Sequence, residues 1–336
     1  MQRTATPLTS VRFRSQPPVM KIIITGSSGF IGFSLAKQLL NSQILVTGID
    51  NHSDYYDVGL KQHRRKLLKS NNFKFKLLDV NDISKFDVSN EKFDILIHLA
   101  AQAGVRLPKS QHYLYEETNI KGFENICRFC IENSISKVIY ASSSSVYSDS
   151  EATKFIEDKT PLAPKSLYGK SKLANENFAH SIYEKFNLKM VGLRFFSVYG
   201  PYGRPDMAYY LFSNKIKNNE KVILHNNGEM ARDMTFIDDI IDGIEKAIEF
   251  INTRTEPCNE IFNLGNDTPI KTSFLLKTLE RKFNKNAKIF STESANESKF
   301  THADLTKARN VLGYVPQVSF SKGIDKFYNW HSEYET

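Results

Sequence analysis

Tyr168 and Lys172 are of the types, and at the spacing, that suit proton transfer. They lie four residues apart in a segment, residues 166–186, that we predict to be helical, so both side chains lie on one helix face. A free tyrosine has a pKa of ~10 and is a poor base at neutral pH. A nearby ammonium favours the phenolate. Because such a pair also occurs by chance in helices, it predicts a general base only together with other signals.

A run of four serines, residues 142–145, is one such signal. It follows a strand predicted at residues 137–141, and a hydroxyl there could link Tyr168 to a hydroxyl of a substrate. A serine run alone is more often a polar loop.

A glycine-rich turn near the start of the chain predicts a diphosphate site. A short β-branched run at residues 21–25 predicts a buried strand, and Gly26, Gly29 and Gly32 follow it directly. Glycines at this spacing permit a tight turn and the close approach of a diphosphate. The helix predicted at residues 30–40 offers its free N–H groups and its positive dipole end to the phosphates.

Asp50 specifies the nucleotide. It ends a second predicted strand, residues 44–49, and a carboxylate there accepts hydrogen bonds from a ribose and repels a 2′-phosphate. Asp79 ends a third predicted strand, where its carboxylate could reach an adenine amine. The pattern predicts NAD rather than NADP as the cofactor.

The alternation of strands and helices predicts an α/β fold with a Rossmann-type, doubly wound parallel sheet. We expect residues 20–194 to form the NAD-binding domain and residues 195–336 to form a smaller α/β substrate lobe, partly interleaved with it. Residues 1–19 carry three arginines and no acid and are expected to be a disordered extension. An organelle transit peptide is the alternative.

Composition narrows the function classes. The 336 residues carry a net charge of +8 and three cysteines, and no stretch has the ~20 apolar residues of a membrane span. Cys127 and Cys130 lie on one face of a predicted helix and are expected to be buried thiols. The basic run at residues 61–66 also holds an apolar stripe, so a solvated helix face is expected rather than a nucleic-acid site. His98, at the end of a predicted strand, is expected to be structural.

Together these motifs resemble the extended short-chain dehydrogenase/reductases, and within them the NAD-dependent nucleotide-sugar epimerase/dehydratase family. The resemblance covers residues 20–330 and is strongest to the UDP-glucuronate 4-epimerases. It rests on five stretches of the chain: residues 48–57, 98–106, 140–147, 193–208 and 232–239.

The resemblance implies roles for particular residues. Tyr168 is the implied base, Lys172 its partner and a ligand of the nicotinamide ribose, and Ser143 the bridging hydroxyl. The positions implied for NAD lie in the glycine-rich turn, at the ends of three strands and on two helices; they are Gly26, Ser28, Gly29, Phe30, Ile31, Gly32, Asp50, Asn51, Asp79, Val80, Leu99, Ala100, Ala101, Gln102, Asn119, Tyr168 and Lys172.

Five further residues are implied for the substrate, and no metal site is implied. Ser144, Ser145 and Ser197 match hydroxyl positions that contact the sugar carboxylate in glucuronate epimerases. Arg232 matches the arginine that holds the UDP diphosphate, and Arg204 lies on the substrate loop. Dehydratases carry Asp-Glu where this chain has the two serines, and galactose-type epimerases carry Asn in place of Ser197.

The chain also departs from the family pattern. Ser148 replaces a glycine, residues 294–296 lack an expected arginine, and residues 297–304 match the uridine-binding stretch only loosely.

The implied function is NAD-dependent 4-epimerisation of a UDP-sugar, UDP-glucuronate to UDP-galacturonate, through a transient 4-keto sugar. The alternatives are 4-epimerisation of UDP-N-acetylglucosamine or UDP-glucose, or a nucleotide-sugar dehydratase or decarboxylase. A third alternative is a non-catalytic NAD-binding regulator or an RNA-binding protein. The presence of Tyr168, Lys172 and Ser143 argues against it, since such a protein needs none of them. We expect a cytoplasmic homodimer, paired through the helices near Asn119 and Ser166, with no nucleic-acid or membrane partner.

Overall fold

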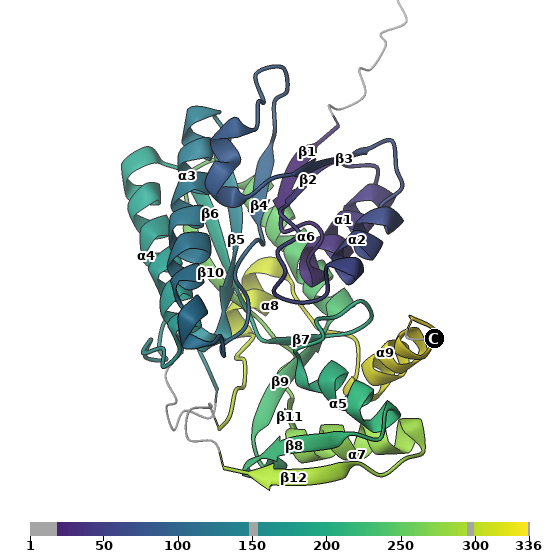
Figure 1. Ribbon diagram of the computed structural model, residues 1–336. Coiled ribbons are helices and arrows are strands. Elements are labelled where there is room, and N and C mark those ends of the chain that lie inside the picture. The colour runs from purple at the N-terminus through teal and green to yellow at the C-terminus, as the bar shows by residue number, and fades with distance from the viewer. Residues whose placement is uncertain (1–18, 148–153, 294–298, 335–336) are drawn as a thin grey trace, which may run out of the picture.

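A parallel seven-stranded sheet forms the centre of the larger part of the molecule, in the order β10-β6-β5-β4-β1-β2-β3 (Figure 1). The computed structural model describes residues 19–147, 154–293 and 299–334. All six strand pairings in this sheet are parallel, which confirms the predicted doubly wound fold. The strands are β1 Lys21–Thr25, β2 Leu45–Asp50, β3 Phe73–Leu77, β4 Ile95–His98, β5 Lys137–Ser143, β6 Lys189–Phe195 and β10 Asn259–Leu264.

Helices cover both faces of the sheet (Figure 1). On one side α1 (Phe30–Asn41) packs against α6 (Ile237–Thr253), and on the other α3 (Gly122–Glu132) packs against α4 (Leu167–Phe186). Burial on both faces explains the β-branched run in β1, whose three isoleucines have no exposed surface. Cys127 and Cys130 are buried in α3, and burial raises the pKa of both thiols, in agreement with the structural role predicted for them.

The last strand of the large sheet comes from late in the chain. β10 pairs with β6 from Asn259↔Met190 to Leu264↔Phe195, and the preceding helix α6 lies under the same sheet. Sequence analysis did not find this strand. Both elements follow residue 194, so the layers of the large sheet draw on both of the predicted domains.

The smaller lobe holds two further sheets. A three-stranded sheet has the order β11-β9-β7, and a parallel pair joins β12 to β8. These elements confirm the predicted smaller α/β lobe; their bounds are β7 Ser197–Tyr199, β8 Lys221–His225, β9 Ala231–Phe236, β11 Pro269–Lys271, β12 Lys288–Thr292, α5 Ala208–Lys217, α7 Thr272–Phe283 and α9 Phe320–Tyr334. Helix α8 (Thr306–Leu312) packs instead against β10 and α6.

The basic helix α2 (Val58–Leu67) departs from prediction. The prediction of a solvated basic face is right for Arg65 and Lys66, which are exposed, but wrong for Lys61 and Arg64, which are 5% and 0% exposed. Arg64 lies four residues after the buried Leu60, so helical spacing already placed it on the inner face.

Parts of the sequence-based reading fall outside the described residues: the extension up to residue 18, Ser148 and residues 294–296. Among the helices that the structure does describe, none combines the length and the apolar character needed to cross a membrane.

Candidate functional site

The glycine-rich loop between β1 and α1 is packed against the end of β4. Gly26 has φ +75°, and a Cβ there would lie 2.7 Å from the amide nitrogen of Ala100. A Cβ on Gly32 would lie 2.1 Å from the Gly26 carbonyl oxygen. No side chain caps α1 and its first turn has no acid, so the N–H groups that begin with Phe30 and Ile31 remain available to an anion. The loop fits a diphosphate.

Carboxylates gather beside this loop at the ends of β2 and β3. Asp50 accepts hydrogen bonds from the amides of Ser28 (3.0 Å) and His52 (2.8 Å). The Asn51 amide donates to Asp79 at 2.6 Å, and Asp79 precedes a short 3-10 helix that starts at Val80. The acids predicted for the ribose and the adenine therefore lie at one edge of the sheet.

Asn119 holds the segment that follows β4. Leu99, Ala100 and Ala101 leave the end of that strand, and the next residue, Gln102, exchanges two hydrogen bonds with the Asn119 amide, at 2.7 and 3.2 Å. Asn119 also donates to the Ser171 hydroxyl (2.9 Å) on α4. It lies in a π-helical turn, Tyr115–Lys121, which runs directly into α3. The extra residue in such a turn is common at functional sites, and sequence analysis did not anticipate it.

Tyr168, Lys172 and Ser143 meet where β5 ends and α4 begins. Lys172 is 1% exposed, and its ammonium donates to the Ala141 carbonyl at 2.9 Å and lies 5.9 Å from the ring centre of Tyr168. Burial lowers the pKa of Lys172 to about 8. The hydroxyl of Ser143 forms a hydrogen bond with Tyr168 and also accepts from the Ser145 amide at 3.1 Å. The three predicted catalytic residues thus lie in one site.

The charge that most favours the Tyr168 phenolate comes from the smaller lobe. Burial raises the pKa of Tyr168, while the Arg204 guanidinium and the hydrogen bond to Ser143 act against that rise. Sequence analysis expected the ammonium of Lys172 to act in this way. Lys172 is instead held by a carbonyl, and Arg204 is the larger opposing influence.

Arg204 sits in a loop between β7 and α5, residues 200–207, which we call the substrate loop. Its guanidinium makes two hydrogen bonds to Asp206, at 3.0 and 2.5 Å. The hydroxyl of Tyr55, from the segment after β2, donates to the same carboxylate at 3.0 Å. Burial and Asp206 raise the pKa of Tyr55 to about 12. Neither Tyr55 nor Asp206 was predicted as a site residue.

Ser144, Ser145 and Ser197 come from both sides of the site. The first two belong to a 3-10 turn, Ser144–Val146, directly after β5, and Ser197 begins β7. All three are partly exposed. Hydroxyls in these positions could donate to an anionic group of a ligand.

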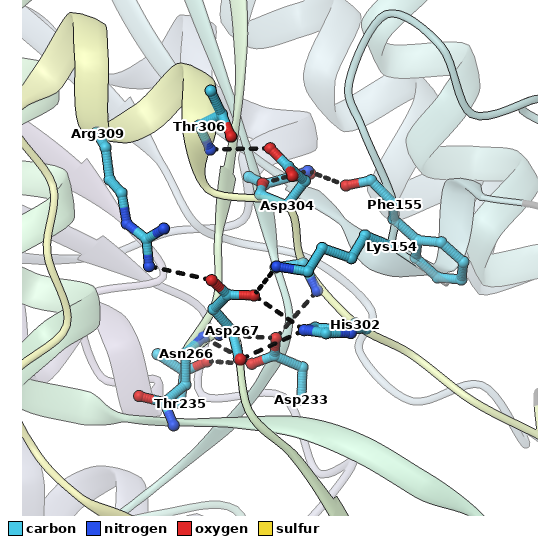
Figure 2. Close-up of polar contacts among 12 residues, drawn as sticks. Lys154, Phe155, Asp233, Thr235, Asn266, Asp267, His302, Asp304, Thr306 and Arg309 are labelled. Atoms are coloured by element: carbon cyan, nitrogen blue, oxygen red, sulfur yellow. Dashed lines mark hydrogen bonds and ion pairs between the residues drawn. The ribbon is translucent and has the colours of Figure 1, made fainter. Parts of the chain in front are cut away.

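Arg232 lies on β9 next to a buried acid, Asp233. The Asp233 carboxylate accepts from three backbone amides, those of Asn266 (2.6 Å), Asp267 (3.0 Å) and Ala303 (3.0 Å) (Figure 2). Burial raises the pKa of Asp233, and these amides oppose the rise. The Asp233 side chain thereby links two loops, which are far from β9 in the sequence, to the strand that carries Arg232.

The stretch predicted to bind uridine runs alongside that strand. Of its residues the structure describes 299–304, and the amide of Thr301 donates to the Ala231 carbonyl at 3.1 Å. The carboxylate oxygens of Asp267 lie within hydrogen-bonding distance of side-chain nitrogens of Lys154 (2.7 Å), His302 (2.9 Å) and Arg309 (3.1 Å), as Figure 2 shows. Burial alone would raise the pKa of Asp267, but these neighbours hold it below its usual value.

His98 fits the structural role predicted for it. It is 1% exposed, its Nδ1 lies 2.8 Å from the Thr25 hydroxyl, and burial lowers its pKa to about 3. Sequence analysis also missed the buried pair of Arg194 and Glu176 (2.8 Å), which joins β6 to α4 behind the site. Among the described residues, no three His, Cys, Asp or Glu side chains are grouped so that they could hold a metal ion.

The Rossmann-type sheet, the glycine-rich loop and the Tyr168–Lys172 pair together define an enzyme of the short-chain dehydrogenase/reductase type. Residues 22–265 match the NAD dependent epimerase/dehydratase family, and the chain belongs to that family.

Particular relatives span almost the whole chain. UDP-glucuronate 4-epimerase 4 of Arabidopsis thaliana is 36% identical over 93% of this chain and 75% of its own. Protein CapI of Staphylococcus aureus is 36% identical over 94% of this chain and 99% of its own. The crystal structure of UDP-glucuronic acid 4-epimerase from Bacillus cereus with UDP-glucuronic acid and NAD is 32% identical, covers 94% of this chain and all of that one, and superposes with a TM-score of 0.86.

Proposed function

We propose that this protein catalyses the NAD-dependent 4-epimerisation of a UDP-sugar, with UDP-glucuronate and UDP-galacturonate as the interconverted pair. The observation that carries the proposal is the meeting of Tyr168, Ser143 and Lys172 with Arg204 from the smaller lobe. The similarity to UDP-glucuronate 4-epimerases supports the choice of sugar.

The residues present fit NAD. The glycine-rich loop leaves no room for a side chain at Gly26 or Gly32 but leaves the first N–H groups of α1 available, as a diphosphate requires. Asp50 keeps an acceptor for a ribose hydroxyl, and its charge disfavours a 2′-phosphate. We assign the NAD-binding residues predicted from the sequence to this site. When bound there, NAD would supply the acceptor and then the donor of the hydride at C4 of the sugar.

Tyr168 is the general base in this mechanism. Its phenolate takes the proton of the C4 hydroxyl and later returns it, and Ser143 relays or orients that proton through the hydrogen bond the two side chains share. Arg204 stabilises the negative charge on the phenolate. Lys172, whose ammonium donates to the Ala141 carbonyl, is the residue that we assign to the nicotinamide ribose.

The substrate is held at its two ends in this proposal. Arg232 binds the UDP diphosphate, beside the segment that Asp233 ties to β9. Ser144, Ser145 and Ser197 donate to the C6 carboxylate of the hexuronate, whose charge requires partners when it leaves water. Hydroxyls bind that carboxylate without the fixed two-point grip of an arginine, so the 4-keto sugar can turn between its two faces.

The proposal is tested by incubating the protein with UDP-glucuronate, UDP-glucose and UDP-N-acetylglucosamine and identifying the products by NMR. Conversion of UDP-glucuronate to UDP-galacturonate is expected. Conversion of only a neutral sugar, or formation of a dehydrated or decarboxylated product, would replace the proposed substrate or reaction by one of the alternatives.

Two further expectations accompany this function. We propose a homodimer that pairs through α3 and α4, to be tested by light scattering in solution. A cytoplasmic location remains a prediction from the small number of cysteines.

A further inference from the structure

Helix α2 carries a buried arginine that the proposed chemistry does not use. Arg64 is 0% exposed, whereas its neighbour Arg65 is exposed and stacks over the Phe75 ring at 4.8 Å. Removing a guanidinium from water costs several kcal/mol unless acceptors replace the lost water. The position of Arg64 is therefore informative, because what it contacts must compensate that cost.

Arg64 contacts three separate segments of the chain. Its Nε and Nη2 donate to the Tyr202 carbonyl (3.1 and 2.8 Å), and Nη2 also donates to the Gly203 carbonyl (3.0 Å). Its Nη1 donates to the Ser28 carbonyl (3.1 Å) and to the Tyr56 hydroxyl (2.6 Å). These partners are carbonyl and hydroxyl oxygens, and none of them carries a charge.

Two of these segments are the loops that would hold the two ligands. Ser28 lies inside the glycine-rich loop, and Gly203 directly precedes Arg204 in the substrate loop. The substrate loop is closely packed at Gly203, because a Cβ there would lie 1.7 Å from the Tyr209 hydroxyl. One guanidinium thus fixes the separation of the two loops.

We propose that Arg64 is a positioning residue that couples the binding of NAD to the binding of the UDP-sugar. By holding the glycine-rich loop and the substrate loop in one arrangement, it lets the ligand that orders one loop lower the cost of ordering the other. The hydrogen bond from Tyr55 to Asp206 is a second link between the same two sides. This inference rests on the proposed function, because it requires both ligands.

Only an arginine can make these contacts. Its five N–H groups form a rigid planar fork, whereas a lysine presents one compact ammonium. Arg64→Lys keeps the charge but leaves carbonyls in at least one loop without their donor. Arg65→Lys makes the same chemical change one residue away, on the exposed face, and is the matched control.

The test measures how fast NAD leaves the purified holoenzyme, with and without saturating UDP. In the unmodified protein UDP is expected to slow NAD release about fivefold or more, within the usual range of coupling between sites. Arg65→Lys should keep that ratio, and Arg64→Lys should bring it close to one. A merely structural role for Arg64 would lower the melting temperature and leave the ratio unchanged.

Each result decides the question. An unchanged ratio in folded Arg64→Lys overturns the inference, and so does an unmodified protein that binds NAD and UDP without any coupling. A protein that binds neither ligand contradicts the proposed function instead. If Arg64→Lys does not fold, Arg64→Gln takes its place, because it also removes the planar fork of donors that reaches the Ser28 and Tyr202 carbonyls. A reduced ratio in that variant then supports the inference, and an unchanged ratio overturns it.

Discussion

The glycine-rich loop and the substrate loop face the same site but are held in different ways. In the first, the backbone shapes the turn: the Gly26 amide donates to the Ile49 carbonyl (2.8 Å), and the Gly29 amide donates to the Gly26 carbonyl (2.9 Å). In the second, side chains shape the turn, through the Arg204–Asp206 pair and the Tyr55 hydroxyl. A loop built from backbone suits one invariant ligand, whereas a loop built from side chains can change its ligand by substitution.

The strongest test of this comparison is Tyr168→Phe, at the point where the two sides meet. Turnover should fall by about 10²–10⁴-fold, the usual contribution of general acid–base catalysis. Binding of NAD and UDP, measured by calorimetry, should change little, because only a hydroxyl is lost. Near-normal turnover would remove Tyr168 from its assigned role.

A substitution in the backbone-shaped loop should act directly on the binding of the cofactor. The added methyl of Gly32→Ala meets the Gly26 carbonyl at 2.1 Å, so the loop must shift. Strain of this kind typically costs ~1–3 kcal/mol, which corresponds to a loss of NAD affinity of roughly 5- to 150-fold.

Gly59→Ala is the control for that change, because it adds the same methyl outside the glycine-rich loop, where the nearest atom to a Cβ is an Asp57 carboxylate oxygen at 3.0 Å. Calorimetric titration with NAD compares the two variants. Equal NAD affinity in both would show that the loop tolerates a side chain.

Changes to the serines assigned to the sugar carboxylate should instead alter which sugar is used. In Ser144→Ala with Ser197→Ala, turnover of UDP-glucuronate should fall by about tenfold or more, since each lost hydrogen bond to a charged group is worth ~1.5–3 kcal/mol. Activity on UDP-glucose, which has no carboxylate, is the internal control. Equal losses on both sugars would mean that these serines do not bind a carboxylate.

The smallest expected effect is a shift in the pH dependence of kcat/KM. Arg204 lowers the pKa of Tyr168, so in Arg204→Gln that pKa should rise and the base form should appear only at higher pH. The ascending limb of kcat/KM against pH should therefore move to higher pH. Arg309→Gln, which loses a guanidinium paired with Asp267 instead, should leave the limb in place. A limb that stays fixed in Arg204→Gln would show that Arg204 does not act on the base.

The features that could be predicted from the sequence are those formed by residues close together in the chain. The glycine-rich turn, its flanking strands and the Tyr168–Lys172 pair each lie within one short segment, where spacing alone determines geometry. The contacts of Arg64 with Tyr202 and of Tyr55 with Asp206 join residues 138 and 151 positions apart, and no local pattern encodes such pairs. The roles predicted for individual binding residues remain predictions until they are measured.

The position of β10 has a consequence for how the chain is made. Until residue 264 has left the ribosome, β6 has no partner on its outer side, and the nascent sheet carries an open edge. Such an edge can pair with another unfinished chain, which is a route to aggregation during synthesis. A protein cut after residue 194 would keep that edge permanently, so the NAD-binding half should not be separable as a well-behaved fragment.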